Sequence, residues 1–276
     1  MRLSRRQFIG LLGGLGLSSC SSLGLDEVKA ERFKPNIHFG KEGPLTFAAI
    51  NDLHVLDAKS TAIVNRAVHH INEQPHIHFT VALGDVATDG KLQEINLVNT
   101  CLDKLQQPYF CVPGNHDVDL AASNIYANYE RAFGACPWTE GEEGWRFIGL
   151  DTCNGAASDV TVPHERMAWL EAHLKKIKPE RPIALFTHHP FNPNTKAYRV
   201  QNAEQVLDLF SGHNLRLVAS GHYHGNQVEE RNGILFTTTA CCSSTRNNFD
   251  GTPAKGYRLF RIEGDRIEHE FIEVSG

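Results

Sequence analysis

The sequence predicts an α/β domain that runs from residue 43 to residue 276. Short apolar runs of strand length alternate with segments whose apolar residues recur every three or four positions, as on one face of a helix. This alternation is typical of layered α/β folds, in which helices cover sheets through right-handed crossovers. The chain has 276 residues, of which 41% are hydrophobic, and this is enough to bury a large core.

Nine apolar runs are predicted to be strands. The closing strands follow one another without a helical pattern between them, so we expect mixed or antiparallel pairing there. The predicted strands are Thr46–Ile50, Ile77–Leu83, Tyr109–Val112, Trp145–Leu150, Ile183–Thr187, Leu215–Ser220, Ile234–Thr238, Tyr257–Ile262 and Ile267–Val274.

Four segments between the strands place their apolar residues on one helical face. These faces consist of Ile63, Val64, Ala67, Val68 and Ile71; of Leu92, Ile95, Val98, Leu102 and Leu105; of Met167, Leu170, Leu174 and Ile177; and of Val206, Leu207 and Phe210.

Polar clusters follow directly after five of the predicted strands. In open α/β sheets, ligands bind beyond the carboxyl ends of the strands, so these clusters predict one shared binding site. Their members are Asn51, Asp52 and His54; Gly84 and Asp85; Gly114, Asn115, His116 and Asp117; His188, His189 and Pro190; and Gly221, His222 and His224.

The clusters offer carboxylate oxygens, an amide oxygen and imidazole nitrogens, and they contain no thiolate. Such ligands suit Mn, Fe or Zn and argue against a closed structural zinc site. Asp52 and His54 are one residue apart on an extended segment, so both can reach the same ion. Asp85 has two carboxylate oxygens and can bridge two ions.

In this order, the clusters resemble the signature of the calcineurin-like metallophosphoesterase family: Asp-x-His, Gly-Asp, Gly-Asn-His-Asp, His, and Gly-His-x-His. The resemblance runs from about residue 45 to residue 225. It implies a four-layer α/β/β/α sandwich and two transition-metal ions. The ligands that it implies are Asp52, His54 and His224 for one ion, Asn115, His188 and His222 for the other, and Asp85 as the bridge.

His116 is expected to take part in the reaction and not to bind a metal ion. By the same resemblance, it protonates the leaving group or stabilises the transition state while a hydroxide held between the ions attacks phosphorus in line. Thr88 departs from two branches of the family, since purple acid phosphatases carry a metal-binding Tyr there and Ser/Thr protein phosphatases an Asp that orients the histidine. What positions His116 is therefore open, with Asp89 and Asp117 as the candidates.

Each cluster also has a simpler interpretation when it is taken alone. Asp52 and Asn115 are common turn residues, Asp85 could cap a helix, and His188 could be a hydrogen-bonded core histidine. These interpretations would all have to hold at five strand ends together, so the metal site is favoured. The histidines that fit no ligand position are interpreted as ordinary surface, strand or core residues: His69, His70, His76, His78 and His189.

The expected activity is hydrolysis of a small phosphoester, with the bacterial cyclic-nucleotide phosphodiesterases as the most similar subgroup. Asp89 stands where protein phosphatases carry a phosphoryl-binding Arg, and a carboxylate there would repel the second charge of a monoester, which favours diesters. The alternatives are a phosphomonoesterase of the acid phosphatase type and a non-catalytic metal-binding scaffold. The formal charge of −5 provides no basic footprint for a nucleic-acid duplex. The oligomeric state stays open.

Residues 1–19 are predicted to be an export signal. Arg5 and Arg6 precede a short, glycine-diluted apolar run, and this resembles the signal that the twin-arginine export machinery reads. Residues 17–20 resemble a lipobox with Cys20 as the lipidated residue, and cleavage elsewhere without a lipid is the alternative. We therefore expect an exported protein of the cell envelope or periplasm, attached to the membrane only through a lipid anchor, with residues 20–42 as a linker.

Overall fold

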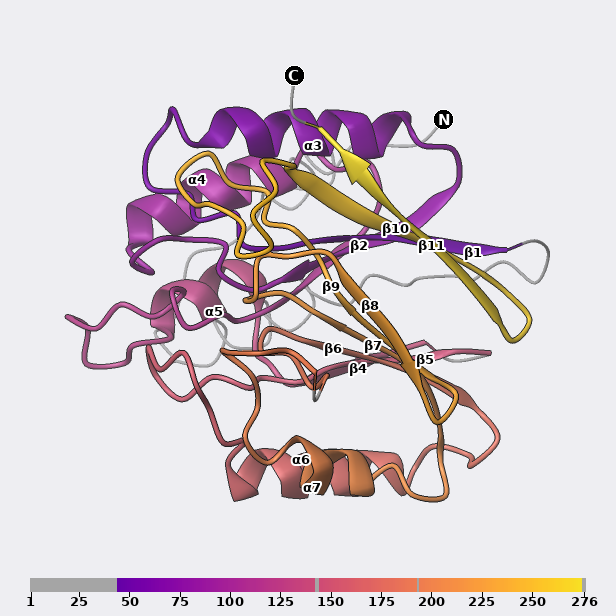
Figure 1. The fold of residues 1–276 in the computed structure, drawn as a ribbon. Coiled ribbons are helices and arrows are strands. Elements are labelled where there is room, and N and C mark those ends of the chain that lie inside the picture. Colours follow the sequence, from indigo (N-terminus) through magenta and orange to yellow (C-terminus); the bar gives the residue numbers. More distant parts are fainter. Residues whose placement is uncertain (1–43, 142–143, 193, 275–276) are drawn as a thin grey trace, which may run out of the picture. The chain divides into compact units, whose positions relative to one another are not determined.

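The computed structural model describes residues 44–141, 144–192 and 194–274. In this part of the chain, two sheets pack face to face and helices cover both outer faces (Figure 1). The layered α/β class expected from the sequence is confirmed. The predicted export signal at residues 1–19, the predicted lipidation site Cys20 and the predicted linker at residues 20–42 lie outside the described residues.

The first sheet is mixed. Its strands, in spatial order, are β11 (Arg266–Glu273), β10 (Gly256–Glu263), β1 (Leu45–Ile50), β2 (Ile77–Leu83) and β3 (Tyr109–Val112). Strands β1, β2 and β3 are parallel, whereas β10 pairs antiparallel with both β1 and β11. The antiparallel pairing expected for the closing strands is therefore confirmed.

The second sheet has a parallel centre and antiparallel edges. Its strands, in spatial order, are β4 (Trp138–Glu140), β5 (Arg146–Gly149), β6 (Pro182–Thr187), β7 (Asn214–Ser220), β9 (Ile234–Thr238) and β8 (Gln227–Arg231). Strands β5, β6, β7 and β9 are parallel, and β4 and β8 close the two edges. In both sheets, the parallel strands end at the same side of the sheet, which positions the site described below.

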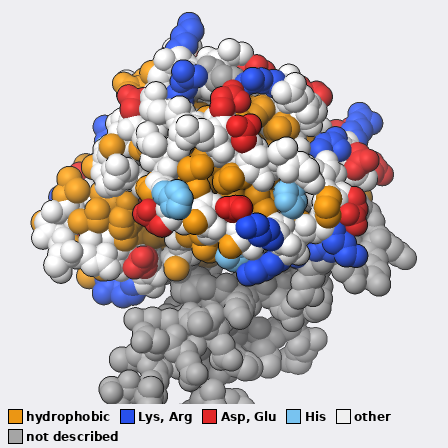
Figure 2. Space-filling model, turned by 90° about the horizontal axis from the view of Figure 1, so that it is seen from below, with side chains coloured by type: hydrophobic (Ala, Val, Ile, Leu, Met, Phe, Trp, Pro, Cys, Tyr) orange, Lys and Arg blue, Asp and Glu red, His pale blue; other side chains and the backbone are white. Residues whose placement is uncertain are grey.

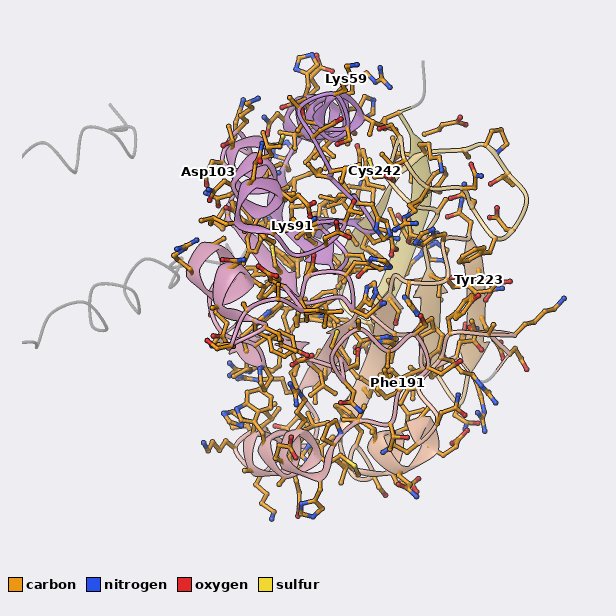
Figure 3. All side chains as sticks on the ribbon, turned by 90° about the vertical axis from the view of Figure 1, so that its left-hand side faces the viewer. Lys59, Lys91, Asp103, Phe191, Tyr223 and Cys242 are labelled. Atoms are coloured by element: carbon orange, nitrogen blue, oxygen red, sulfur yellow. The ribbon has the colours of Figure 1, made fainter. Side chains whose placement is uncertain are left out.

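Helices form the two outer layers. They are α3 (Thr61–Glu73), α4 (Leu92–Leu102) and α5 (Ala127–Phe133) on the first sheet, and α6 (His164–Leu174) and α7 (Ala203–Asp208) on the second. Each helix layer shares a core with the outward side of its sheet. Figure 3 shows Cys242 beneath α3 and Phe191 close to α6 and α7, and both belong to these outer cores.

A third core lies between the two sheets. Phe47 of β1 enters this core, while its neighbour Ala48 faces the helices, because successive side chains of a strand point to opposite sides. Phe47 stacks between Phe79 of β2 and Phe260 of β10, with ring centroids 4.8 Å apart in both pairs. Burial on both sides explains why these strands are continuous apolar runs in the sequence.

The predicted helical faces are buried with one clear exception. In α3, all five predicted residues are buried. In α4, Leu92 is 41% exposed, so the prediction that it packs inward is wrong. The first turn of α4 instead buries Glu94, whose carboxylate accepts the backbone N–H of Asp89 at 2.7 Å. An acidic side chain at this position stabilises free N–H groups before the helix.

Three elements have no clear signal in the sequence. Strand β4 has only three residues, and α5 has seven. Strand β8 is polar and alternates between half-buried and exposed residues, as expected for an edge strand with one side in water. Such short or polar elements are stabilised by the neighbours on which they pack, and not by their own apolar pattern.

The face that carries α6 and α7 bears charges of both signs (Figure 2). Figure 2 shows basic and acidic side chains interspersed there without one large patch of either sign. Lys175 and Glu171 of this face form an ion pair at 2.8 Å one helical turn apart. Among the described residues, no helix has both the length and the apolar character needed to span a membrane.

Candidate metal centre

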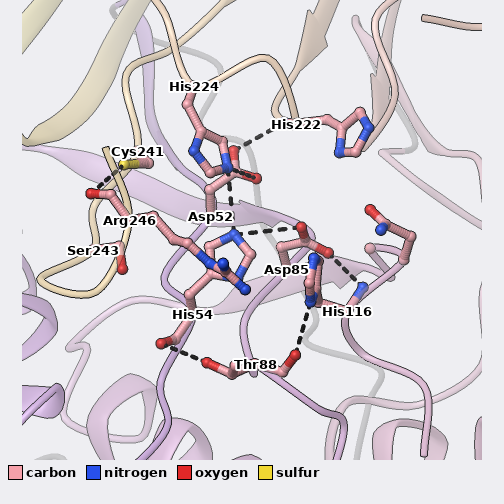
Figure 4. Close-up of polar contacts among 12 residues, drawn as sticks. Asp52, His54, Asp85, Thr88, His116, His222, His224, Cys241, Ser243 and Arg246 are labelled. Atoms are coloured by element: carbon pink, nitrogen blue, oxygen red, sulfur yellow. Dashed lines mark hydrogen bonds and ion pairs between the residues drawn. The ribbon is translucent and has the colours of Figure 1, made fainter. Parts of the chain in front are cut away.

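All seven predicted ligands lie together at the carboxyl ends of the parallel strands. Strands β1, β2 and β3 of the first sheet lead into Asp52 and His54, Asp85, and Asn115, whereas β6 and β7 of the second sheet lead into His188, His222 and His224. Two buried groups of potential ligand atoms lie here. The first, shown in Figure 4, consists of Asp52, His54, Asp85 and His224, and the second consists of His188, His189 and His222. The site thus lies where the two sheets face each other.

The backbone of this site is strained. Five of the seven predicted ligands have positive φ angles although none is glycine: Asp52 (52°), His54 (43°), Asp85 (50°), His222 (64°) and His224 (46°). A non-glycine residue in this region costs about 1 kcal/mol or more, and such residues concentrate at functional sites. The turns therefore direct the predicted ligand side chains inward, and this conformation costs energy that an ordinary turn would not need.

Two motif glycines are needed because the strand ends approach each other closely. A Cβ at Gly84 would lie 2.5 Å from the ring nitrogen Nδ1 of His188, and a Cβ at Gly114 would collide with the backbone nitrogen of Asp85. Gly84 also has a φ of 84°, which glycine adopts readily. These residues let the two sheets approach closely enough to share ligands.

The first group consists of Asp52, His54, Asp85 and His224. The His224 Nε2 atom lies 3.1 Å from Asp52 Oδ1, and the His54 Nε2 atom lies 3.3 Å from His224 Nε2 and 3.5 Å from Asp85 Oδ2. Ligand atoms about 2.1 Å from a tetrahedral ion lie about 3.4 Å apart, so this spacing fits a bound cation. Two imidazole nitrogens that face each other at 3.3 Å can share a bound cation in this arrangement.

The second group is built around His188. Its Nε2 atom lies 3.3 Å from Asn115 Oδ1 and 3.3 Å from Asp85 Oδ1. The His222 ring is next to it, with centroids 4.7 Å apart. Asp85 thus turns one oxygen toward each group, as the sequence predicts for a bridging carboxylate.

Backbone carbonyl groups fix the orientation of three ligand imidazoles. A carbonyl only accepts hydrogen bonds, so the ring nitrogen that faces it carries the proton and the other nitrogen has a free lone pair. The pairs are His188 Nδ1 with Leu83 O (2.8 Å), His224 Nδ1 with Asn247 O (3.0 Å) and His222 Nε2 with Ser158 O (2.9 Å). The nitrogens left available to a metal ion are therefore Nε2 of His188 and His224, and Nδ1 of His222.

The electrostatics of the site favour positive charge. Burial would raise the pKa of Asp85, but His188 beside it lowers that pKa well below its usual range, and His224 lowers the pKa of Asp52 in the same way. Conversely, burial would lower the pKa of His188, but Asp85 raises it to about 9, and Asp52 raises the pKa of His224 to about 11. Two buried carboxylates that stay ionised need compensating cations.

His116 borders the groups without belonging to either. Its backbone N–H donates to Asp85 Oδ1 at 2.8 Å, and its ring Nδ1 lies 2.8 Å from the carbonyl oxygen of Thr88. The carbonyl fixes the proton on Nδ1, so Nε2 is the nitrogen that can exchange a proton. The Thr88 carbonyl therefore orients His116, and no side chain is needed for this.

The two carboxylates considered for positioning His116 have other partners. Asp117 accepts the backbone N–H groups of Ala87 at 2.9 Å and Gly114 at 2.8 Å, so it holds two site loops together. Asp89 is half exposed and pairs with the Lys91 ammonium at 2.8 Å. Neither orients the imidazole. The N-cap position of α4, Lys91, makes no side-chain cap hydrogen bond.

A pocket of about 160 Å³ opens over the groups. Besides site residues, its lining contains four residues that no sequence motif indicates: Ser158, Tyr198, Arg246 and Phe249. They come from loops whose sequences show no recognisable pattern.

His189 was interpreted from the sequence as an ordinary residue, yet it belongs to the second buried group of potential ligands, together with His188 and His222. Its ring centroid is 4.4 Å from that of His222, Nδ1 contacts the Thr152 hydroxyl at 2.9 Å, and Nε2 has no hydrogen-bond partner. The sequence signal that could have indicated this was that His189 directly follows the predicted ligand His188.

The calcineurin-like phosphoesterase family model matches residues 45–226. The chain belongs to this family. The match covers the whole series of strand-end clusters, so the metallophosphoesterase fold and its two candidate metal groups agree with the family.

Several relatives of this metallophosphoesterase are phosphodiesterases by name. A probable cyclic nucleotide phosphodiesterase of Rhodopseudomonas palustris is 33% identical over 222 residues, which is 74% of this chain and 81% of the relative. A probable glycerophosphodiester phosphodiesterase of Arcobacter nitrofigilis is 28% identical over 218 residues, which is 74% of each chain. A 3′,5′-cyclic-nucleotide phosphodiesterase of Nostoc is 24% identical over 244 residues, which is 80% of this chain and 89% of the relative.

Solved structures share the fold at low sequence identity. The anchor in the inner membrane complex of Plasmodium superposes with a TM-score of 0.64 at 17% identity, covering 84% of this chain and 85% of that one. The purple acid phosphatase of yellow lupin (Lupinus luteus) seeds superposes with a TM-score of 0.63 at 9% identity, covering 85% of this chain and 52% of that one.

Proposed function

We propose that this metallophosphoesterase hydrolyses small phosphodiesters with two bound metal ions. The observation that carries the proposal is the position of Asp85, whose oxygens lie 3.5 Å from His54 Nε2 and 3.3 Å from His188 Nε2 in the two ligand groups. Two ions that share such a carboxylate would polarise the phosphoryl group and lower the pKa of a nucleophilic water. Neither ligand group contains a cysteine, and this fits Mn, Fe or Zn.

His116 supplies the proton for the leaving group in this proposal. Its Nδ1–H is held by the Thr88 carbonyl at 2.8 Å, so the imidazolium form presents one further N–H, on Nε2, to the pocket. A histidine held in this way can act as a general acid at neutral pH. Its position outside both ligand groups is what distinguishes it from a ligand histidine.

The choice of diester over monoester rests on the relatives. Cyclic nucleotides and glycerophosphodiesters, which the relatives' names specify, are both phosphodiesters. The electrostatic argument from Asp89 does not add support, because Asp89 is paired with Lys91 and does not line the pocket.

The test is a comparison of bis-nitrophenyl phosphate with nitrophenyl phosphate as substrates of the metal-loaded protein. We expect a higher kcat/KM for the diester, loss of activity with a chelator, and recovery with Mn²⁺ or Zn²⁺. A clear preference for the monoester would identify a phosphomonoesterase. Hydrolysis of neither ester by protein that retains its metals would identify a non-catalytic scaffold.

We also propose that the protein is exported by the twin-arginine machinery and anchored in the cell envelope through lipidated Cys20. The support is the sequence of residues 1–20, with Arg5 and Arg6 before a short apolar run. Changing Arg5→Lys with Arg6→Lys should trap the precursor in the cytoplasm, and Cys20→Ala should release the protein from membranes or block processing. Unchanged delivery after the double arginine change rules out this route.

A further inference from the structure

The pocket has one wall that the metal groups do not explain. This wall consists of Tyr198, Arg246 and Phe249. Arg246 and Phe249 lie on the loop of residues 239–255 between β9 and β10, and Tyr198 lies on the loop between β6 and α7. None of the three belongs to either ligand group.

The loop that carries Arg246 is fixed to two of the metal ligands. The Thr245 hydroxyl donates to the carbonyl of His54 at 3.1 Å, and the Asn247 carbonyl accepts the His224 Nδ1–H at 3.0 Å. The Phe249 N–H donates to the carbonyl of His224 at 2.9 Å. Arg246 lies between these anchors, so its side chain starts from a fixed point beside the site.

Arg246 is a cation without an anionic partner. Figure 4 shows its side chain extending from the loop toward His54. Within the described part of the chain, it forms no ion pair, its buried Nε has no hydrogen-bond partner, and no other Arg or Lys lines the pocket. A guanidinium fork matches two oxygens of a phosphoryl group, so this position suits a phosphoester placed over the metal groups.

Phe249 and Tyr198 give the same pocket an aromatic rim. Phe249 is 54% exposed, which is unusual for this side chain. Its ring stacks on His224 with centroids 5.1 Å apart and planes 14° apart, and it lies 5.4 Å from the Tyr198 ring. Tyr198 has a φ of 59° and packs edge-on against His222 at 5.6 Å. The strained backbone of Tyr198 directs this ring to the site.

We propose that Arg246, Tyr198 and Phe249 form the substrate-recognition side of the pocket: Arg246 binds a non-bridging phosphoryl oxygen, and the rim of Phe249 and Tyr198 stacks on a flat aromatic group of the ester. The substrate class is therefore phosphodiesters that carry a heteroaromatic group, such as a nucleobase, in preference to glycerol-type diesters. This inference rests on the proposed phosphodiesterase function. Stacking stabilises the binding of any planar aromatic group, so it selects a class of substrates and not one particular nucleotide.

The test uses 3′,5′-cyclic AMP as the aromatic diester and glycerophosphocholine as the non-aromatic one. Phe249→Ala should lower the ratio of their kcat/KM values by about five- to a hundred-fold, mainly through the KM for the nucleotide, because base stacking is lost. Phe249→Trp should restore the ratio. Leu120→Ala, which removes another exposed apolar side chain (70% exposed), is the matched control and should leave the ratio unchanged.

Arg246 is tested by kinetics with both substrates and by a measurement of nucleotide binding. Arg246→Ala should reduce kcat/KM for both diesters by about ten- to a hundred-fold with unchanged metal content, and Arg246→Lys should recover part of the loss. Arg266→Ala is the control, since that arginine is 75% exposed on β11. In a His116→Ala background, which slows turnover by about 10²–10⁴-fold, calorimetry should show weaker binding of 3′,5′-cyclic AMP for both Arg246→Ala and Phe249→Ala.

The outcomes separate the two proposals. If the wild type hydrolyses diesters but the Phe249 and Arg246 variants keep their substrate ratio, kcat/KM and nucleotide affinity, the recognition proposal is overturned and the proposed function stands. If the metal-loaded wild type hydrolyses no diester, the proposed function fails and the recognition proposal fails with it.

Discussion

The two sheets contribute different chemistry to the metal centre. The first sheet supplies every oxygen ligand, and the second supplies only imidazoles. The contributions are Asp52, His54, Asp85 and Asn115, with His116 beside them, from the first sheet, and His188, His222 and His224 from the second. The negative charge of the site is therefore concentrated at the ends of β1 and β2.

This difference means that each ion would need both sheets. The first ligand group joins Asp52 to His224 at 3.1 Å, and the second joins Asp85 and Asn115 to His188 at 3.3 Å. Metal binding would therefore tie the sheets together at their carboxyl ends, while the aromatic core ties them together along their length. Without metal ions, the raised pKa values of His188 and His224 mean that protonated imidazoles would balance the buried carboxylates of the first sheet instead.

The largest expected effect follows from removing the shared carboxylate. Asp85→Ala should lose metal and lower activity by about 10⁴-fold or more, because both ions depend on this side chain. Metal analysis and hydrolysis of bis-nitrophenyl phosphate measure the two losses. Asp89→Ala is the matched control, since it removes a carboxylate from the same loop that is exposed and paired with Lys91. Normal metal content in Asp85→Ala would refute the bridging role.

A smaller effect is expected from the histidine of the first sheet that binds no metal. His116→Ala should keep both ions and lose turnover by about 10²–10⁴-fold, as is typical for general acids. The loss should be smallest for nitrophenyl leaving groups, which need no proton. His69→Ala, on an exposed position of α3 (77% exposed), serves as the control. Equal losses for good and poor leaving groups would contradict the acid role.

The stability of the domain tests whether ions link the sheets. Each ion present at 100 times its Kd contributes about 2.7 kcal/mol to the free energy of unfolding. Two ions therefore contribute about 5 kcal/mol, which for a domain of this size corresponds to a Tm rise of about 10–20 °C. Chelation should lower Tm by this amount in the wild type and much less in Asp85→Ala. An equal response of both proteins would mean that the ions do not act through Asp85.

The smallest effect is expected at Asp89. Because its carboxylate is half exposed and paired with Lys91 at 2.8 Å, Asp89→Asn should change the ratio of diester to monoester kcat/KM by less than about two-fold, since exposed charges are screened by solvent. Kinetics with the two nitrophenyl esters measure the ratio. A ten-fold shift toward the monoester would show that Asp89 acts on the substrate after all.

The sequence predicted a set of residues that the structure brings together because their signals are local. Each ligand directly follows an apolar strand, and the order of the clusters along the chain carries the family signature. Apolar periodicity likewise predicted the buried face of α3, because all of its buried residues pack on one sheet. These features depend on neighbours within a few residues, which a sequence displays directly.

The remaining features depend on residues far apart in the sequence. The Thr88 carbonyl that orients His116 is a backbone group, so the identity of residue 88 gave no indication of it. Arg246 and Phe249 reach the pocket only because their loop is bonded to His54 and His224. Asp89 is an exception, because its partner Lys91 is only two residues away, and the argument that placed its charge near the substrate did not consider that ion pair.

The most direct test of the dinuclear site is a metal titration of the metal-free wild-type protein, with bound metal and hydrolysis of bis-nitrophenyl phosphate followed together. Two ions should bind per chain, and activity should appear only as the second ion binds, because Asp85 and both ligand groups act as one centre. Full activity with one ion per chain, or with none, would contradict the two-metal site.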